Sequence, residues 1–103
     1  MAKSNVPVSV YVLLSLLDNR FYVGITDNLQ RRLAEHQSGR TKSTRHRRPF
    51  RLLHTEEFPT RRDAVRRERY LKSGSGHKFL ESLRNKVVDA PPTASRENGT
   101  ASG

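Results

Sequence analysis

Residues 22–36 read YVGITDNLQRRLAEH, and this stretch decides how the rest of the chain is arranged. It begins as the end of a β-strand, passes through a turn, and continues as an amphipathic helix for which Asp27 is the predicted N-cap. Arg32 and His36 fall on the same side of that helix as its leucines. A cation and an imidazole that face a core are costly unless an anionic group meets them there. This pattern is the first indication of a functional site.

The composition predicts a small basic protein of one domain. The chain has 103 residues with a formal net charge of +10 and a pI of about 11.1. Such an excess favours a polyanionic partner, nucleic acid before a membrane surface. The alternative is a ribosome-associated or merely soluble basic protein. The absence of cysteine excludes disulfides and thiolate metal sites, and is compatible with the cytoplasmic location that we expect.

The apolar run from Val10 to Leu17 is predicted to be a core strand. It is too short to span a bilayer, and no small-residue cleavage site follows it. We therefore expect neither a signal peptide nor contact with a membrane.

The order of elements follows from apolar periodicity and turn residues. Strands are predicted over 8–15 and 20–26, joined as a hairpin, and over 51–58. Helices are predicted over 27–38, 62–73 and 77–87, with Gly39 ending the first and Thr60 capping the second. The order is therefore β-β-α-β-α-α. The domain is predicted to span 8–88, between a loose N-terminus at 1–7 and a disordered tail at 89–103.

Two tyrosines lie on the more polar faces of the hairpin strands. By the period of two, Tyr11 shares a face with Ser9 and Leu13, and Tyr22 shares a face with Gly24. Whether these are one common face depends on the strand register, which the sequence leaves open.

Glu68 is the one acid on the apolar face of the second long helix. That face is defined by Ala64, Val65 and Leu71, which are spaced for a helix. One hypothesis is that Glu68 pairs with a neighbouring arginine in a partly buried salt bridge. The other is that it binds Mg²⁺, because hard cations take carboxylate oxygen and often use only one or two protein ligands.

The first helix offers the same choice with the opposite charge. Arg32 and His36 are spaced i, i+4, so their side chains are neighbours. They are either a packed arginine stem beside a surface histidine, or parts of a site. Together with Tyr11, Tyr22 and Glu68 they would supply a base, a cation and a metal ligand, as phosphodiester hydrolysis requires. A tyrosine acting as the base would need its pKa lowered by adjacent cations.

These residues resemble the signature of the GIY-YIG nuclease superfamily, specifically its small single-domain members. Tyr22-Val23-Gly24 is similar to the second half of the signature, and Ser9-Val10-Tyr11 keeps the tyrosine of the first half. Arg32, ten residues after Tyr22, His36 and Glu68 stand at the family's arginine, tyrosine-or-histidine and glutamate positions.

The resemblance implies an α/β (α+β) sandwich, in which helices flank a central three-stranded antiparallel sheet. It implies an endonuclease that cleaves nucleic acid, with DNA as the expected substrate, using one divalent Mg²⁺ or Mn²⁺ held by Glu68. Tyr11 or Tyr22 would deprotonate or position water with help from His36, and Arg32 would stabilise phosphate charge. The alternatives are a binding module that keeps the fold but cuts poorly or not at all, and a structural RNA-associated protein.

A basic loop over 40–51, with two lysines further on, is predicted to grip the nucleic-acid backbone. The alternative is a solvated charge run. The predicted contacts are Arg40, Lys42, Arg45, Arg47, Arg48, Lys72 and Lys78. We expect a monomer that acts in DNA repair, with a protein partner targeting it to its substrate.

Overall fold

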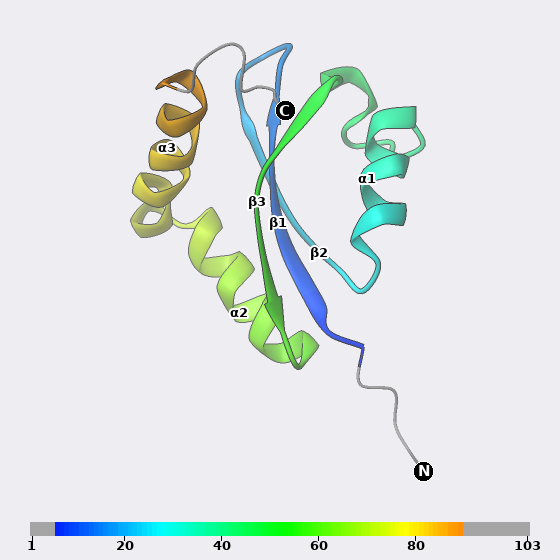
Figure 1. Ribbon diagram of the computed structural model, residues 1–103, viewed down its shortest axis with the longest axis vertical. Helices are drawn as coiled ribbons and strands as arrows, with labels where there is room; N and C mark the ends of the chain where they lie inside the picture. Colours follow the sequence, from blue (N-terminus) through cyan, green and yellow to red (C-terminus); the bar gives the residue numbers. More distant parts are fainter. Residues whose placement is uncertain (1–5, 90–103) are drawn as a thin grey trace.

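A central strand organises the fold, a three-stranded antiparallel sheet with helices on both faces (Figure 1). The computed structural model describes residues 6–89. Residues 1–5 of the predicted loose N-terminus (1–7) and residues 90–103 of the predicted tail (89–103) lie outside them. The elements confirm the predicted order. They are β1 (Val8–Ser15), β2 (Phe21–Thr26), α1 (Leu29–Ser38), the 3₁₀ turn η1 (Arg45–Arg47), β3 (Phe50–Phe58), α2 (Arg61–Lys72) and α3 (Gly74–Asp89).

β1 lies between β2 and β3 because its side chains are apolar or small on both faces. All eight of its residues are buried, whereas β2 and β3 are partly exposed. Both neighbours pair with β1 in antiparallel register, with Tyr11 opposite Gly24 and Leu13 opposite Tyr22. Since directly opposed residues share a face, Tyr11 and Tyr22 lie on the same face of the sheet. The register thus resolves the question that the sequence left open.

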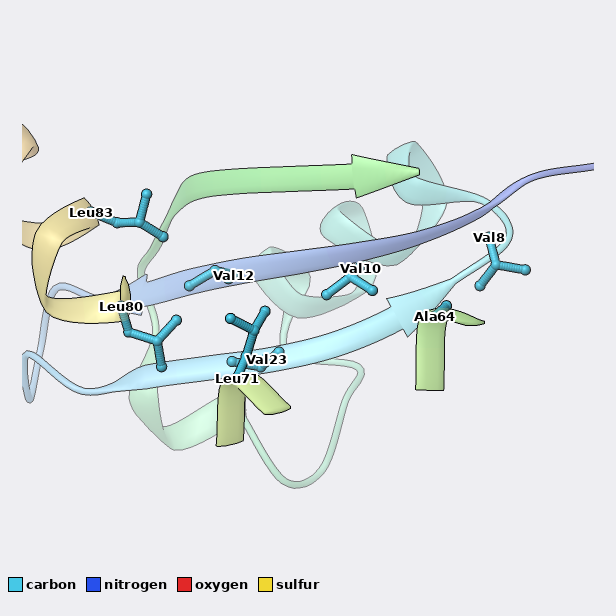
Figure 2. Close-up of a cluster of buried hydrophobic side chains, with 8 residues drawn as sticks. All are labelled: Val8, Val10, Val12, Val23, Ala64, Leu71, Leu80 and Leu83. Carbon is cyan, nitrogen blue, oxygen red and sulfur yellow. The ribbon is translucent and has the colours of Figure 1, made fainter. Parts of the chain in front are cut away.

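The two faces of the sheet carry different cores. α2 and α3 cover one face, where Val10, Val12 and Val23 pack with Leu71 and Leu80 (Figure 2). α1 lies on the other face (Figure 1), where a smaller cluster contains Tyr11, Leu13 and Phe50 with Leu29 and Leu33 packed against it. The side chains of the signature tyrosines therefore belong to the α1 face.

The helix termini follow the predicted chemistry with one exception. Gly39 ends α1 in the left-handed conformation, and Thr60 caps α2 by accepting from the Asp63 N–H. The predicted N-cap Asp27 is wrong by one residue. The Thr26 hydroxyl accepts from the Asn28 N–H at 3.0 Å, which tightens the turn and leaves the Asn28 side chain to cap Arg31.

α3 begins earlier than predicted, at Gly74, because its cap lies in a stretch rich in glycine and serine. The Ser73 hydroxyl accepts from the Gly76 N–H at 3.3 Å and so caps the first turn. A Cβ on Gly76 would lie 2.1 Å from the carbonyl oxygen of Tyr70, so only glycine allows this close approach to the end of α2. Among residues 6–89, none of the helices has the length and apolar character of a transmembrane segment.

Candidate functional site

The candidate site is built around the two signature tyrosines, which lie beside each other under α1. Their ring centroids are 6.2 Å apart, and the His36 ring lies 4.9 Å from that of Tyr22. Tyr11 is 1% exposed and His36 is fully buried, whereas Tyr22 is only partly buried. The alternative of a surface histidine is therefore wrong.

A hydrogen-bond chain connects Tyr11 to the loop after α1. The Tyr11 hydroxyl lies 2.9 Å from His36 Nε2, and His36 Nδ1 lies 2.8 Å from the Thr44 hydroxyl. Thr44 is fully buried, and its hydroxyl points at the carbonyl oxygen of Thr41 at 3.5 Å. Thr44 was not among the residues predicted from the sequence, because nothing in the basic loop marks this threonine as buried.

One tautomer of His36 satisfies every donor and acceptor in this chain. If the Thr44 hydroxyl donates to the Thr41 carbonyl, its oxygen is left to accept from His36 Nδ1–H. His36 Nε2 then has its lone pair free and accepts from the Tyr11 hydroxyl. This arrangement satisfies both buried ring nitrogens of a neutral imidazole.

Burial controls the titration of both groups. Removal from water raises the pKa of Tyr11 to about 12, although the adjacent Arg32 guanidinium acts in the opposite direction. Burial, followed by the charge of Arg32, lowers the pKa of His36. Tyr11 therefore lacks the lowered pKa that a tyrosine base would need, because desolvation outweighs the effect of Arg32. Tyr11 is a neutral hydrogen-bond donor near pH 7.

Arg32 lies at the edge of this cluster, half-buried, and pairs with Glu35. Its Nη1 donates to Glu35 Oε1 at 2.9 Å, and this hydrogen bond raises the pKa of Arg32. The guanidinium is therefore permanently charged and has a third of its side chain exposed. It has donors left for a further anion.

Glu68 lies apart from the tyrosine cluster, on the helix that covers the other face of the sheet. Its ion-pair partner is Lys72, with Nζ 3.0 Å from Oε2. The predicted pairing with an arginine is wrong: the neighbouring Arg67 instead binds Glu56 through two hydrogen bonds of 2.9 and 3.0 Å. Glu68 is 19% exposed and Lys72 is 55% exposed.

The donor set suits a loosely held hard cation. Within the described part of the chain, no three His, Asp or Glu side chains converge on a metal position. Glu68 would thus offer a single carboxylate. Mg²⁺ accepts such a site, because it commonly uses one or two carboxylates and takes its other ligands from water and substrate phosphates.

A surface hollow lies on the side of the sheet that α2 and α3 cover. It has a volume of about 410 Å³ and lies between β2, α2 and α3. Tyr22 lines it from β2, and Lys72, the partner of Glu68, lines it from α2. Glu68, Arg32 and His36 do not line this hollow, and the ring of Tyr22 packs in the cluster on the α1 face.

The predicted nucleic-acid contacts divide into two groups. Arg47 is bound to Asp18 at 3.2 Å, Arg48 donates to the carbonyl oxygen of Arg45, and Lys72 is paired with Glu68. The other four are exposed and form no ion pair with any residue in 6–89. They are Arg40, Lys42, Arg45 and Lys78.

Comparison with known proteins gives a consistent result for most of the chain. Residues 7–80 match the sequence model of the GIY-YIG catalytic domain. A UPF0213 protein of Natronomonas pharaonis is 48% identical over 65 residues, which cover 62% of this chain and 75% of the relative. One from Bacillus licheniformis is 36% identical over 86 residues, covering 80% and 89%. The name UPF0213 states no activity or substrate.

One solved structure is also similar. It is the solution NMR structure of a UPF0213 protein from Bacillus halodurans, which shares 38% sequence identity. The match covers 76% of this chain and 85% of that one, with a TM-score of 0.47.

Proposed function

Since the chain belongs to the GIY-YIG catalytic-domain family, we propose that it is a metal-dependent endonuclease that hydrolyses phosphodiester bonds in DNA. Membership in this family implies a nuclease fold and a nucleic-acid substrate. The observation that carries the proposal is the buried chain from Tyr11 through His36 to Thr44, with Tyr22 and Arg32 beside it. An ordinary core would not need a satisfied histidine, two tyrosines and an arginine in one cluster.

We assign the two tyrosines different roles. Tyr11 is a positioning residue, because it is buried, neutral and engaged with His36. Tyr22 is only partly buried and is the tyrosine available to orient or deprotonate the attacking water. His36 contacts the Tyr22 ring edge-on, so it holds the ring of the reactive tyrosine as well as the hydroxyl of Tyr11.

Side chains from two helices would stabilise the negative charge of the phosphate. Arg32 of α1 would contact a non-bridging oxygen and stabilise the charge that develops there. Glu68 of α2 would hold one Mg²⁺ or Mn²⁺. A divalent ion at this carboxylate would polarise the phosphate and stabilise the leaving oxygen.

A cleavage assay with matched variants tests the proposal. Branched, nicked and linear DNA are incubated with Mg²⁺ or Mn²⁺ and either the wild type, Glu68→Gln or Arg32→Gln. Each variant is expected to lose about 10²–10³-fold in rate. Glu57→Gln and Lys86→Gln are the controls, since both side chains are exposed and neither forms an ion pair with another residue in 6–89. Equal cleavage by all five proteins would indicate a contaminant and overturn the assignment.

Two observations are compatible with the alternative, a nucleic-acid-binding module that does not cleave. Glu68 is neutralised by Lys72, and Tyr11 keeps its proton, so the site resembles a resting binding surface as much as an active one. Tight, salt-sensitive binding without cleavage in either metal would favour the binding module. It stays a prediction that the protein is a cytoplasmic monomer, that a partner protein targets it to its substrate, and that it acts in DNA repair.

A further inference from the structure

α2 carries two kinds of arginine. Arg67 points toward the protein: it binds Glu56, and its guanidinium lies 5.2 Å from the centre of the Phe79 ring. Arg62, Arg66 and Arg69 are exposed, and none forms an ion pair or side-chain hydrogen bond with another residue in 6–89. We call these three residues the arginine stripe.

The stripe is a continuous feature of the helix surface. The spacing i, i+4, i+7 places the three side chains on one face, opposite the buried Ala64 and Leu71. They line a shallow surface hollow together with Val65. The stripe was not among the contacts predicted from the sequence, which lay in the basic loop and at two lysines.

We propose that the arginine stripe is a binding surface for the sugar–phosphate backbone of duplex nucleic acid. At about 1.5 Å per residue the stripe is about 10 Å long, which matches about three phosphates of one strand at about 3.4 Å of axial rise. Arginine binds phosphate through a planar pair of donors. The stripe would read no sequence, because backbone contacts position a duplex without specifying bases.

Two other classes of partner fit the observations less well. A membrane-binding helix needs a free apolar face, but the apolar face of α2 is buried against the sheet. A protein interface needs an apolar or aromatic centre, and Val65 is the only apolar side chain in this hollow. A polyanion with regularly spaced charges matches the stripe directly.

The position of the stripe relates it to the proposed function, on which this inference partly rests. Arg69 lies about 100° around the helix from Glu68, and Arg62 and Arg66 lie further from it. Glu68 is on the side of α2 that carries the buried Ala64 and Leu71, so a duplex seated on the stripe would lie away from the proposed metal ligand. The stripe would therefore be a second contact with the same class of substrate, separate from the site that acts on it.

The test measures binding without cleavage. Anisotropy of a fluorescent duplex of mixed sequence is titrated in EDTA at several salt concentrations, with wild type and with Arg62→Gln/Arg66→Gln/Arg69→Gln. Since each phosphate contact contributes about 0.9 to the slope of log K against log salt, the slope should fall by about 2 to 3. Affinity near 0.1 M salt should fall at least about tenfold.

A second triple variant removes the same charge elsewhere. Arg20→Gln/Arg61→Gln/Lys86→Gln changes three exposed cations outside the stripe, on the hairpin turn, at the start of α2 and on α3. Its slope should fall by less than about one. Lysine at all three stripe positions should restore most of the slope. Unfolding midpoints in urea are measured to verify that every variant is folded.

The outcomes separate this inference from the proposed function. Equal losses of slope in both triple variants, or wild-type binding by the stripe variant, would overturn the stripe even if the wild type cuts DNA. Failure of the wild type to bind the duplex would overturn it too. Binding that depends on the stripe would support it even if no cleavage is observed. Preferential binding to anionic vesicles, lost in the stripe variant, would replace the duplex by a membrane surface.

Discussion

Gly24 is predicted to be required because of Tyr11. The two residues are opposite each other in the β1–β2 register, and a Cβ on Gly24 would lie 2.5 Å from the Tyr11 hydroxyl oxygen and 2.7 Å from Cζ. Ordinary carbon–carbon contacts are about 3.5–4.0 Å, so the tyrosine ring or the strand must shift by about 1 Å. Neighbouring atoms prevent the Tyr11 ring from moving aside, because Tyr11 is 1% exposed and its hydroxyl is hydrogen-bonded to His36.

We expect Gly24→Ala to lower the free energy of unfolding by about 2–4 kcal/mol. Overpacking in a tight core costs about 1–3 kcal/mol, and displacing the Tyr11 hydroxyl from His36 costs about 1–3 kcal/mol more. About 0.4–1 kcal/mol is recovered, because alanine restricts the unfolded chain more than glycine does. Backbone conformation is not the obstacle, because Gly24 does not have a positive φ. Among the described residues, Gly39 is the glycine that does.

A double-mutant cycle in urea measures the coupling. Tyr11→Leu has no atom where Cζ and the hydroxyl stand, so in that background Gly24→Ala should cost at least about 1 kcal/mol less than in the wild type. Gly74→Ala is the matched control, because nothing lies within 4 Å of its added Cβ. An equal cost of Gly24→Ala in both backgrounds, or no cost at all, would refute the steric argument.

Three further perturbations concern the buried hydrogen-bond chain. Burial lowers the pKa of His36 in the folded protein, so as pH falls below about 6.5 the unfolded chain takes up this proton first. The free energy of unfolding should therefore fall, and His36→Gln should weaken this pH dependence in urea melts. As pH rises from about 10 toward the folded Tyr11 pKa of about 12, stability should fall by up to about 2–3 kcal/mol, a decline that Tyr11→Phe should lack. Thr44→Val should lower the free energy of unfolding by about 1–3 kcal/mol, because it leaves His36 Nδ1–H without an acceptor. Thr44→Ser should retain most of the urea midpoint. Equal midpoints for Thr44→Val and wild type would contradict the hydrogen bond from His36 to Thr44.

Features coded by neighbouring residues could be predicted from the sequence. The order of elements follows from local periodicity, and the left-handed cap at Gly39 and the Thr60 cap follow from single residues. The position of Asp27 shows the limit of this reasoning. Both Asp27 and Asn28 are suitable caps, and the Thr26 hydroxyl selects between them.

The internal details of the site depend on contacts between distant segments. The common face of the two tyrosines comes from strand register, and the burial of His36 depends on Thr44 in the following loop. The direction of the Tyr11 pKa shift depends on how completely α1 covers it, which residue spacing does not reveal. The Lys72 partner of Glu68, by contrast, could have been predicted from its i, i+4 spacing.

The signature residues therefore divide into those that build the site and those left free to act. Gly24 makes room for Tyr11, Tyr11 binds His36, and both are buried too deeply to meet a substrate. Tyr22 and Arg32 lie at the edge of this rigid group, each with part of its side chain exposed. Preorganisation of this kind is what a catalytic site requires, because a reactive group must be held within a fraction of an ångström of its working position. Tyr11 is thus held by burial and a hydrogen bond, whereas Glu68 is held by an ion pair to Lys72, whose side chain is 55% exposed.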